Sequence, residues 1–225
     1  MTDLILFGVF PYVAVALAVA VGTYRYVVDR YSWSSHSSEF LESRLLFWGS
    51  VPWHYAILLI LLAHLLPVLF PAGWGVLLGR PMRLYFLEVT GLALGLCTVI
   101  AIVLLLARRL ADARLAAVTT KIDWLVLALL LLQVATGVYI AFSLRWGGVW
   151  YVHTATPWLR SLLTFQPEVQ HLAALPVVVK LHACNAFLLV ALLPFSRLVH
   201  ALSVPLGYLA RPYQVVIWYR EQRGK

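Results

Sequence analysis

The chain has 225 residues, of which 63% are hydrophobic and only 12% are charged, and its mean hydropathy is +0.89. A soluble 25.3 kDa protein has too little interior to hide this much apolar surface, which excludes a soluble enzyme, a disordered tail and a collagen-like fibre. The formal net charge of +8 is typical of basic loops beside membrane helices, so we expect membrane lipid as a partner and no nucleic acid.

Five stretches are long and apolar enough to cross a membrane, because a spanning helix needs about 20 mostly apolar residues. We therefore predict an all-α, polytopic membrane protein whose residues 1–225 form a single membrane-embedded domain. The apolar runs are continuous, which excludes the alternating strands of a membrane β-barrel. The predicted spans are residues 4–28, 45–70, 84–107, 122–144 and 172–204.

The basic residues predict the orientation of these spans. Twelve of the 17 Lys and Arg residues flank the first connection, the third connection and the C-terminal end. The positive-inside rule places that side in the cytoplasm, so we expect a cytoplasmic C-terminus and an N-terminus outside. The longest connection, about residues 145–171, then lies outside, and its tryptophans suit a segment in the headgroup layer.

Four of the seven histidines lie inside the predicted spans: His54 and His64 in the second, His182 and His200 in the fifth. An ionisable side chain inside a membrane usually has a partner and a function. The pattern favours ligation of a metal or a haem, and it leaves a proton relay or a structural polar network open. The two cysteines form no CxxCH motif, so any haem is expected to be of b type.

Helix geometry predicts how these histidines pair. Ten residues place His54 and His64 about 15 Å apart along one helix, and eighteen residues place His182 and His200 on one face. Because the second and fifth spans are antiparallel, His54 is expected to meet His200 near the cytoplasm. His64 then meets His182 near the outside, which gives two bis-His haems. A straight helix would separate His182 and His200 by about 27 Å, which does not match about 15 Å on the second span. Pro194 can kink or end the helix between them, and a tilt of the fifth span is the other way to absorb part of the difference.

Two features of the third span carry alternative interpretations. Gly91 and Gly95 form a GxxxG pattern, which favours close helix packing, although the same notch could make room for the face of a haem. Glu88, near the outer end of the span, is either a surface group or part of a proton exit, and the sequence does not decide between them.

Charged residues near the cytoplasmic ends are also of interest. Arg109 and Arg197 are either part of the positive-inside signal or partners of haem propionates, which are anions that need such donors. Asp123 is expected to cap the start of the fourth helix.

Several motifs are distributed along the chain. PFSRLVH at Pro194–His200 is followed by Ser203-Val204-Pro205, Tyr208-Leu209, Arg211 and Tyr213-Gln214. Shorter ones are Pro11-Tyr12, Arg25-Tyr26, Tyr31-Ser32-Trp33, Arg108-Arg109-Leu110, Thr119-Thr120, Thr164-Phe165, Gln170-His171-Leu172 and Leu181-His182. Together with the five spans, these motifs resemble the cytochrome b (gamma) subunit of respiratory nitrate reductase over nearly the whole chain.

The resemblance implies a membrane anchor in the prokaryotic plasma membrane that holds two b haems. It assigns His64 and His182 to the outer haem iron, and it assigns His54 and His200 to the inner one. It implies oxidation of a quinol, menaquinol or ubiquinol, near the outer face. Electrons would then pass to a cytoplasmic iron–sulfur subunit and a molybdenum catalytic subunit that reduces nitrate.

The quinol site departs from the family pattern. The family has a lysine in the connection after the second span, whereas here Arg83 is closest in register and Arg80 is nearby. We expect the quinol pocket near His64, Gly73, Arg80 and Arg83. Three alternatives remain: a dihaem anchor of another quinone-linked oxidoreductase (with electron flow in either direction), a haem-free proton channel or transporter, and a purely structural anchor.

Overall fold

A computed structural model describes residues 1–33, 38 and 40–202, and these residues are helical with no β-strand among them. Each predicted span corresponds to one long helix, so the prediction of an all-helical protein with five long apolar helices is confirmed. The long helices are α2 (Phe10–Val28), α3 (Arg44–Leu69), α5 (Pro81–Ala111), α7 (Lys121–Ser143) and α11 (Val177–Leu192).

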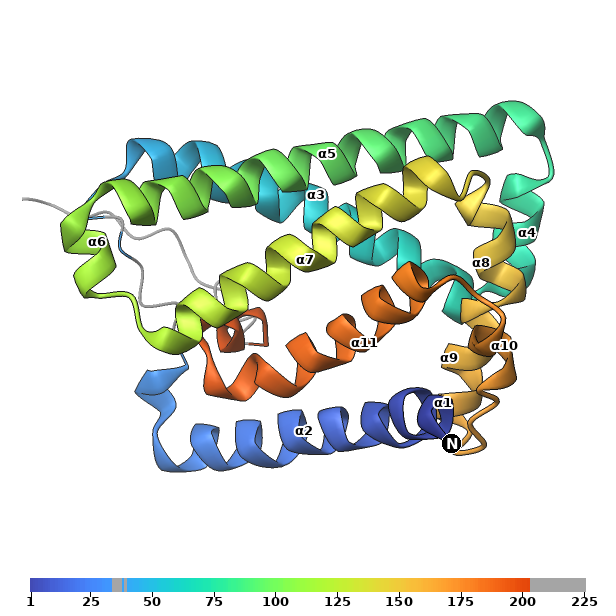
Figure 1. The fold of residues 1–225 in the computed structure, drawn as a ribbon, viewed down its shortest axis with the longest axis horizontal. Helices are drawn as coiled ribbons and strands as arrows, with labels where there is room; N and C mark the ends of the chain where they lie inside the picture. The colour runs from blue at the N-terminus through green and yellow to red at the C-terminus, as the bar shows by residue number, and fades with distance from the viewer. Residues whose placement is uncertain (34–37, 39, 203–225) are drawn as a thin grey trace, which may run out of the picture.

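Short helices lie at the two ends of the bundle (Figure 1). One end, which we call the N-terminal end, carries α1 (Thr2–Leu4), α4 (Pro71–Leu78), α8 (Gly147–His153), α9 (Ala155–Leu163) and α10 (Gln170–Ala173). A π-helical turn, Ile5–Val9, joins α1 to α2. The opposite end, which we call the Arg108 end, carries α6 (Ala113–Ala117) and the 3-10 turns Arg30–Ser32, Leu193–Phe195 and Arg197–Ala201.

In Figure 1 the long helices α5, α7, α11 and α2 follow one another across the bundle, and α3 packs against α5. Trp53 of α3, Ala101 and Ile102 of α5, and Val134 of α7 form one buried apolar cluster. A second cluster closes the N-terminal end, and there the indole N–H of Trp158 donates to the main-chain oxygen of Phe7 at 2.9 Å. The predicted headgroup-layer segment therefore folds as α8–α10 across this end.

Most of the apolar surface of the long helices faces outward. Only 17–28% of each spanning window is buried inside the molecule, and large side chains such as Leu58 and Ile100 are each 62% exposed. In water this surface would be costly, because burial of apolar area is the main favourable term in folding. Hydrocarbon removes that cost, so the outward surface is one that a lipid bilayer covers.

The predicted bounds of the fifth span, 172–204, are wrong for its helical part. Pro176 precedes the helix, which begins at Val177 and ends at Leu192. Pro194 then lies in a 3-10 turn, and Ser196 is extended with φ −126° and ψ 178°. The apolar run continues through this region, but proline cannot donate the hydrogen bond that continues a helix. Residues 203 and 204 of the predicted span, and the basic residues after them, lie outside the described residues.

Close helix packing explains one glycine of the GxxxG pattern. A Cβ added to Gly95 would lie 2.9 Å from Cγ2 of Val138 on α7, so α5 and α7 approach closely there. A Cβ added to Gly91 would meet nothing within 4 Å. The packing interpretation therefore holds for Gly95 and gives no role to Gly91.

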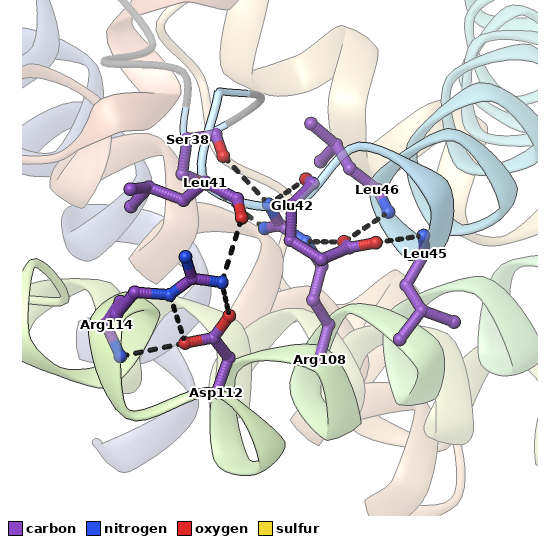
Figure 2. Close-up of polar contacts among 8 residues, drawn as sticks. All are labelled: Ser38, Leu41, Glu42, Leu45, Leu46, Arg108, Asp112 and Arg114. Atoms are coloured by element: carbon purple, nitrogen blue, oxygen red, sulfur yellow. Dashed lines mark hydrogen bonds and ion pairs between the residues drawn. The ribbon is translucent and has the colours of Figure 1, made fainter.

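Arg108 joins the start of α3 to the end of α5 (Figure 2). Its guanidinium is 2% exposed and donates to the Glu42 carboxylate at 2.6 Å, to Ser38 Oγ at 3.0 Å, and to the main-chain oxygens of Ser38 (3.0 Å) and Glu42 (2.6 Å). Glu42 also accepts the N–H groups of Leu45 and Leu46 at the beginning of α3. The Leu45 N–H and then Arg108 hold the pKa of Glu42 below its ordinary value.

A second ion pair, between Arg114 and Asp112, lies near the Arg108–Glu42 pair on the surface (Figure 2). Arg114 binds Asp112 at 3.0 Å and donates to the main-chain oxygen of Leu41 at 3.3 Å. The hydrogen bonds from Arg114 lower the pKa of the Asp112 carboxyl. Because its guanidinium is 69% exposed, this pair contributes little to stability compared with Arg108.

We predict that Arg108→Gln lowers the thermal unfolding midpoint of the detergent-purified protein by about 5 °C or more, since it removes several hydrogen bonds made by a buried charge. The matched control is Arg114→Gln, which removes an exposed arginine from the same surface and should move the midpoint by about 2 °C or less. Equal shifts for the two variants would contradict the role assigned to Arg108.

Candidate functional site

The two histidines of α3 share one local geometry. The Nδ1 atoms of His54 and His64 each lie 2.7 Å from the main-chain oxygen four residues earlier, that of Ser50 and of Ile60 respectively. A carbonyl oxygen can only accept, so each Nδ1 carries the hydrogen and each Nε2 carries the lone pair. Both side chains are exposed on α3, which leaves their rings accessible to a large planar ligand.

The structure brings His54 and His200 together from opposite parts of the chain. Their ring centroids lie 6.1 Å apart at an interplanar angle of 65°, and the Nδ1 of His200 lies 2.6 Å from the main-chain oxygen of Arg197. Two imidazoles that bind one metal from opposite sides, with bonds of about 2 Å, have centroids about 6 Å apart. The spacing and the tautomer of this pair therefore fit bis-His ligation of one haem iron.

The position of His200 depends on the break after α11. Sequence geometry placed His182 and His200 on one face of an unbroken helix and gave Pro194 as a point where that helix can kink or end. The α-helix ends at Leu192, just before Pro194, so the one-face arrangement does not hold. His200 instead lies in the 3-10 turn Arg197–Ala201, after Pro194 and the extended Ser196. The chain from Leu193 onward is not a straight continuation of α11, so the rise of about 27 Å calculated for an unbroken helix does not apply to it.

An ion pair anchors this turn to α7. Asp123 forms the expected cap, because Thr120 N–H donates to its carboxylate at 2.9 Å while the Thr120 hydroxyl accepts from Asp123 N–H at 3.3 Å. The same carboxylate lies 3.1 Å from Nε of Arg197, whose Nη2 donates to the main-chain oxygen of Val118. Arg109 donates to Thr119 Oγ1 at 2.8 Å. Arg109 and Arg197 thus contact the same α6–α7 connection, at the end of the bundle that carries His200.

His182 lies against α7 and is held by side chains. Its Nδ1 lies 3.0 Å from Thr136 Oγ1, and its Nε2 lies 3.1 Å from Gln133 Nε2. A Cβ added to Gly137 would lie 3.1 Å from Cε1 of the ring, so the glycine permits this close approach. The ring of His182 is half-buried between the two helices.

His64 faces a different neighbour from the one that sequence geometry gave it. The ring centroids of His64 and Tyr151 lie 5.5 Å apart in a T-shaped arrangement. The Tyr151 hydroxyl donates to the main-chain oxygen of His64 at 3.1 Å. Burial raises the pKa of Tyr151 to about 12, so the phenol stays protonated at neutral pH. Within the described part of the chain, no ring contact like that of His54 and His200 joins His64 to His182.

The candidate quinol residues lie at the N-terminal end. Gly73 is on α4, Arg80 precedes α5, and Arg83 is in its first turn, and all three are exposed. Among the described residues, no hydrogen bond, ion pair or ring contact joins Arg80 or Arg83 to His64. An open hollow of about 330 Å³ is lined by Leu78, Gly79, Pro81, Leu84 and Trp146, three of which are sequence neighbours of Arg80 or Arg83.

A second open hollow, of about 510 Å³, lies at the start of α11 on the side of Thr136. It is lined by Ala135, Thr136, Tyr139, Pro176 and Val178. The two hollows lie on different helices of the same end of the bundle, and the second adjoins a side chain that contacts His182.

Glu88 caps the beginning of helix α8. Its carboxylate accepts the N–H groups of Gly147 (3.2 Å) and Gly148 (2.7 Å) at the beginning of α8. A carboxylate is favourable at the positive end of a helix, so Glu88 links the part of α5 near the N-terminal end of the bundle to α8 rather than pointing into lipid.

The family model for the nitrate reductase gamma subunit matches residues 3–219. The chain belongs to the nitrate reductase gamma subunit family. It is 34% identical over 218 residues to the nitrate reductase gamma chain of Bacillus subtilis, covering 96% of this chain and 98% of that one. It is also 34% identical over 221 residues to the respiratory nitrate reductase 1 gamma chain of Escherichia coli, covering 95% and 96%. A nitrate reductase-like protein of Mycobacterium tuberculosis shares 34% identity over 212 residues, which cover 91% of this chain and 32% of that protein.

Family membership and the five long apolar helices together make this gamma subunit a membrane protein and a subunit of an oxidoreductase complex. Sequence reasoning missed three side chains that contact His64 or His182: Gln133, Thr136 and Tyr151. Gln133 and Thr136 interrupt an otherwise apolar run in the fourth span, and that interruption is a signal that could have found them. Tyr151 lies in a connection rich in aromatic residues, where nothing in the sequence distinguishes it.

We predict that Gly137→Ala destabilises this gamma subunit by about 1–3 kcal/mol, because its methyl group would press on the His182 ring and force a shift of the ring or of α7. Gly91→Ala is the matched control, since its methyl group meets open space and alanine favours the helix by about 1 kcal/mol. Thermal unfolding in detergent measures both. A Gly137 variant as stable as the Gly91 variant would contradict the close approach.

Proposed function

We propose that the chain is the quinol-oxidising cytochrome b subunit of a respiratory nitrate reductase. In this proposal it holds two b haems and passes electrons from quinol to an iron–sulfur subunit and a molybdenum catalytic subunit. The observation that carries the proposal is the pair His54 and His200, whose rings lie 6.1 Å apart and whose Nδ1 atoms each face a main-chain oxygen.

In this proposal His54 and His200 hold the inner haem, and His64 and His182 hold the outer haem. When bound, each haem supplies a one-electron couple between ferric and ferrous iron. The protein's part is to hold each imidazole with its lone pair on Nε2, and a hydrogen bond at Nδ1 does this because it fixes both the tautomer and the ring orientation. Carbonyl acceptors provide that bond for three of the four rings.

The direction of transfer follows from orientation. The excess of Lys and Arg on one side supports a cytoplasmic Arg108 end and an outer N-terminal end. His64 and His182 then lie on the outer side, where quinol would release two protons, and its two electrons would move inward toward His54 and His200. Each charge that crosses against about 100 mV stores about 2.3 kcal/mol, so quinol oxidation would contribute to the membrane potential.

Arg109 and Arg197 are proposed partners of the inner haem propionates. Both lie at the Arg108 end and contact the α6–α7 connection, and Arg197 is the first residue of the turn that carries His200. Planar guanidinium groups suit carboxylate partners because they offer several donors in a fixed fork.

The quinol site is proposed at the N-terminal end, around His64, Gly73, Arg80 and Arg83. Arg83 would replace the lysine of the family pattern and would donate to a quinol oxygen. Menaquinol and ubiquinol both carry such oxygens, so this contact does not choose between them. The open hollow lined by the sequence neighbours Gly79, Pro81 and Leu84 supports this location.

The cytoplasmic partners are proposed to dock at the Arg108 end. The candidate surfaces are the first connection, residues 31–44, and the tail after Pro205, which lies outside the described residues. Within the first connection, Arg108 fixes Ser38 and Glu42 through its hydrogen bonds, which gives part of this surface a defined conformation.

We predict that the purified wild-type chain contains two b haems, and that His64→Leu loses the outer one together with quinol oxidation. The pyridine haemochrome assay and reduced-minus-oxidised spectra measure the haem count. The matched control is His171→Leu, which removes a half-buried histidine paired with Glu168 and should retain both haems. Full haem content in the His64 variant would refute the ligand assignment, and a wild-type chain without a b-type band would support a haem-free proton channel instead.

We also predict that Arg83→Ala raises the KM for quinol about 10-fold or more, because a hydrogen bond from a charged donor contributes about 1.5–3 kcal/mol. Arg83→Lys should recover most of the loss, since lysine is the family residue. The control is Arg145→Ala, which removes an exposed arginine from the same end of the bundle. A KM that is unchanged in Arg83→Ala would move the quinol site elsewhere, for instance to the hollow beside Thr136.

A further inference from the structure

His182 differs from the other three intramembrane histidines in what its Nδ1 contacts. The Nδ1 atoms of His54, His64 and His200 face main-chain oxygens, whereas that of His182 faces the hydroxyl of Thr136 at 3.0 Å. Thr136 lies on α7, 8% exposed, while His182 lies on α11. The contact therefore joins two helices through a side chain that a single substitution can change.

A main-chain oxygen determines which groups donate and which accept on the Nε2 side of His182. Asn185 Nδ2 donates to the main-chain oxygen of Leu129 at 3.0 Å, and because that oxygen can only accept, the amide orientation of Asn185 is determined. The same nitrogen donates to Gln133 Oε1 at 2.7 Å. Gln133 therefore turns its amide nitrogen, a donor, toward His182 Nε2 at 3.1 Å.

The main chain of α7 likewise determines which group donates and which accepts on the Nδ1 side of His182. Thr136 has one hydroxyl hydrogen, and its oxygen lies 2.7 Å from the main-chain oxygen of Leu132 and 3.0 Å from that of Gln133. Both oxygens can only accept, so the hydrogen is directed to this main-chain side. Toward His182 the hydroxyl can then only accept. Both ends of the network thus require the same tautomer of His182, with the hydrogen on Nδ1 and the lone pair on Nε2.

We propose that Thr136 is the positioning residue for His182 and that its hydroxyl sets the donor strength of this imidazole toward the outer haem iron. The inference rests on the proposed function, in which His182 is an iron ligand. An acceptor at Nδ1 makes an imidazole a stronger electron donor through Nε2. Stronger donation favours the more positively charged ferric iron, so Thr136 lowers the midpoint potential of the outer haem.

Gln133 and Thr136 have different places in this proposal. Gln133 contacts Nε2, the nitrogen that an iron would need, so its amide must move aside for ligation. Thr136 contacts Nδ1, which stays available to it in the ligated ring. Of the two, Thr136 is therefore the residue whose contact with His182 can persist when iron binds, and it is the one to test.

The test is an equilibrium redox titration of the purified complex, followed by the optical spectra of its two haems. Thr136→Val keeps the side-chain shape but removes the acceptor, and we expect an upward shift of the outer midpoint potential with the inner one unchanged. Thr136→Ser restores the hydroxyl and should restore the wild-type value. His64→Leu is expected to lack the outer haem, so the titration step that is missing in this variant is the one that belongs to the outer haem.

Thr98→Val is the matched control, because Thr98 is fully buried and its hydroxyl donates to the main-chain oxygen of Gly95 without touching a histidine. It should leave both potentials unchanged. Loss of the outer haem from Thr136→Val but not from Thr136→Ser also supports the proposal. Unchanged potentials in Thr136→Val, parallel shifts of both haems, an effect of Thr98→Val on the outer potential, or loss of the outer haem from Thr136→Ser would each overturn it. A wild-type protein without b haem would refute the proposed function, and this inference with it.

Discussion

In hydrocarbon a polar group without a partner is costly, because no water is available to replace its hydrogen bonds. The polar side chains inside this bundle meet that constraint largely through the main chain. His54 and His64 each use a carbonyl of their own helix, and the amide nitrogen of Asn185 reaches a carbonyl of α7, while its buried amide oxygen has no hydrogen-bond partner among the described residues. Each of these contacts also fixes a ring or an amide in one orientation. The main-chain oxygen that replaces a lost hydrogen bond with water therefore also sets the direction in which the side chain points.

The same constraint accounts for how four of the long helices, α3, α5, α7 and α11, are held at the Arg108 end of the bundle. Arg108 is buried at the end of α5 and finds its partners in the connection before α3. Asp123 begins α7 and pairs with Arg197, which follows the break after α11. Between them, these two charged contacts join four of the five long helices at one end, where apolar packing alone would leave several relative positions nearly equal in energy.

Hydropathy and charge were sufficient to predict five helices and to select four histidines, because a bilayer fixes the length of a span and makes polar residues conspicuous. Local geometry within one helix was also predictable, as for the cap formed by Asp123. The path of residues 193–201 was not, since an apolar run looks the same whether Pro194 bends a helix or ends it. Contacts between helices, such as Thr136 with His182 and Tyr151 with His64, depend on rotation about each helix axis, which hydropathy does not specify.

The pairing of His54 with a turn near residue 200 has a consequence for biosynthesis. The ribosome produces α3 early, and the first member of each proposed histidine pair enters the membrane while α11 has yet to be made. His182 and His200 arrive only with the last span and the turn that follows it. Neither pair can therefore close around a cofactor during most of translation, and cofactor capture in the proposed arrangement becomes a late step that follows insertion of the final helix.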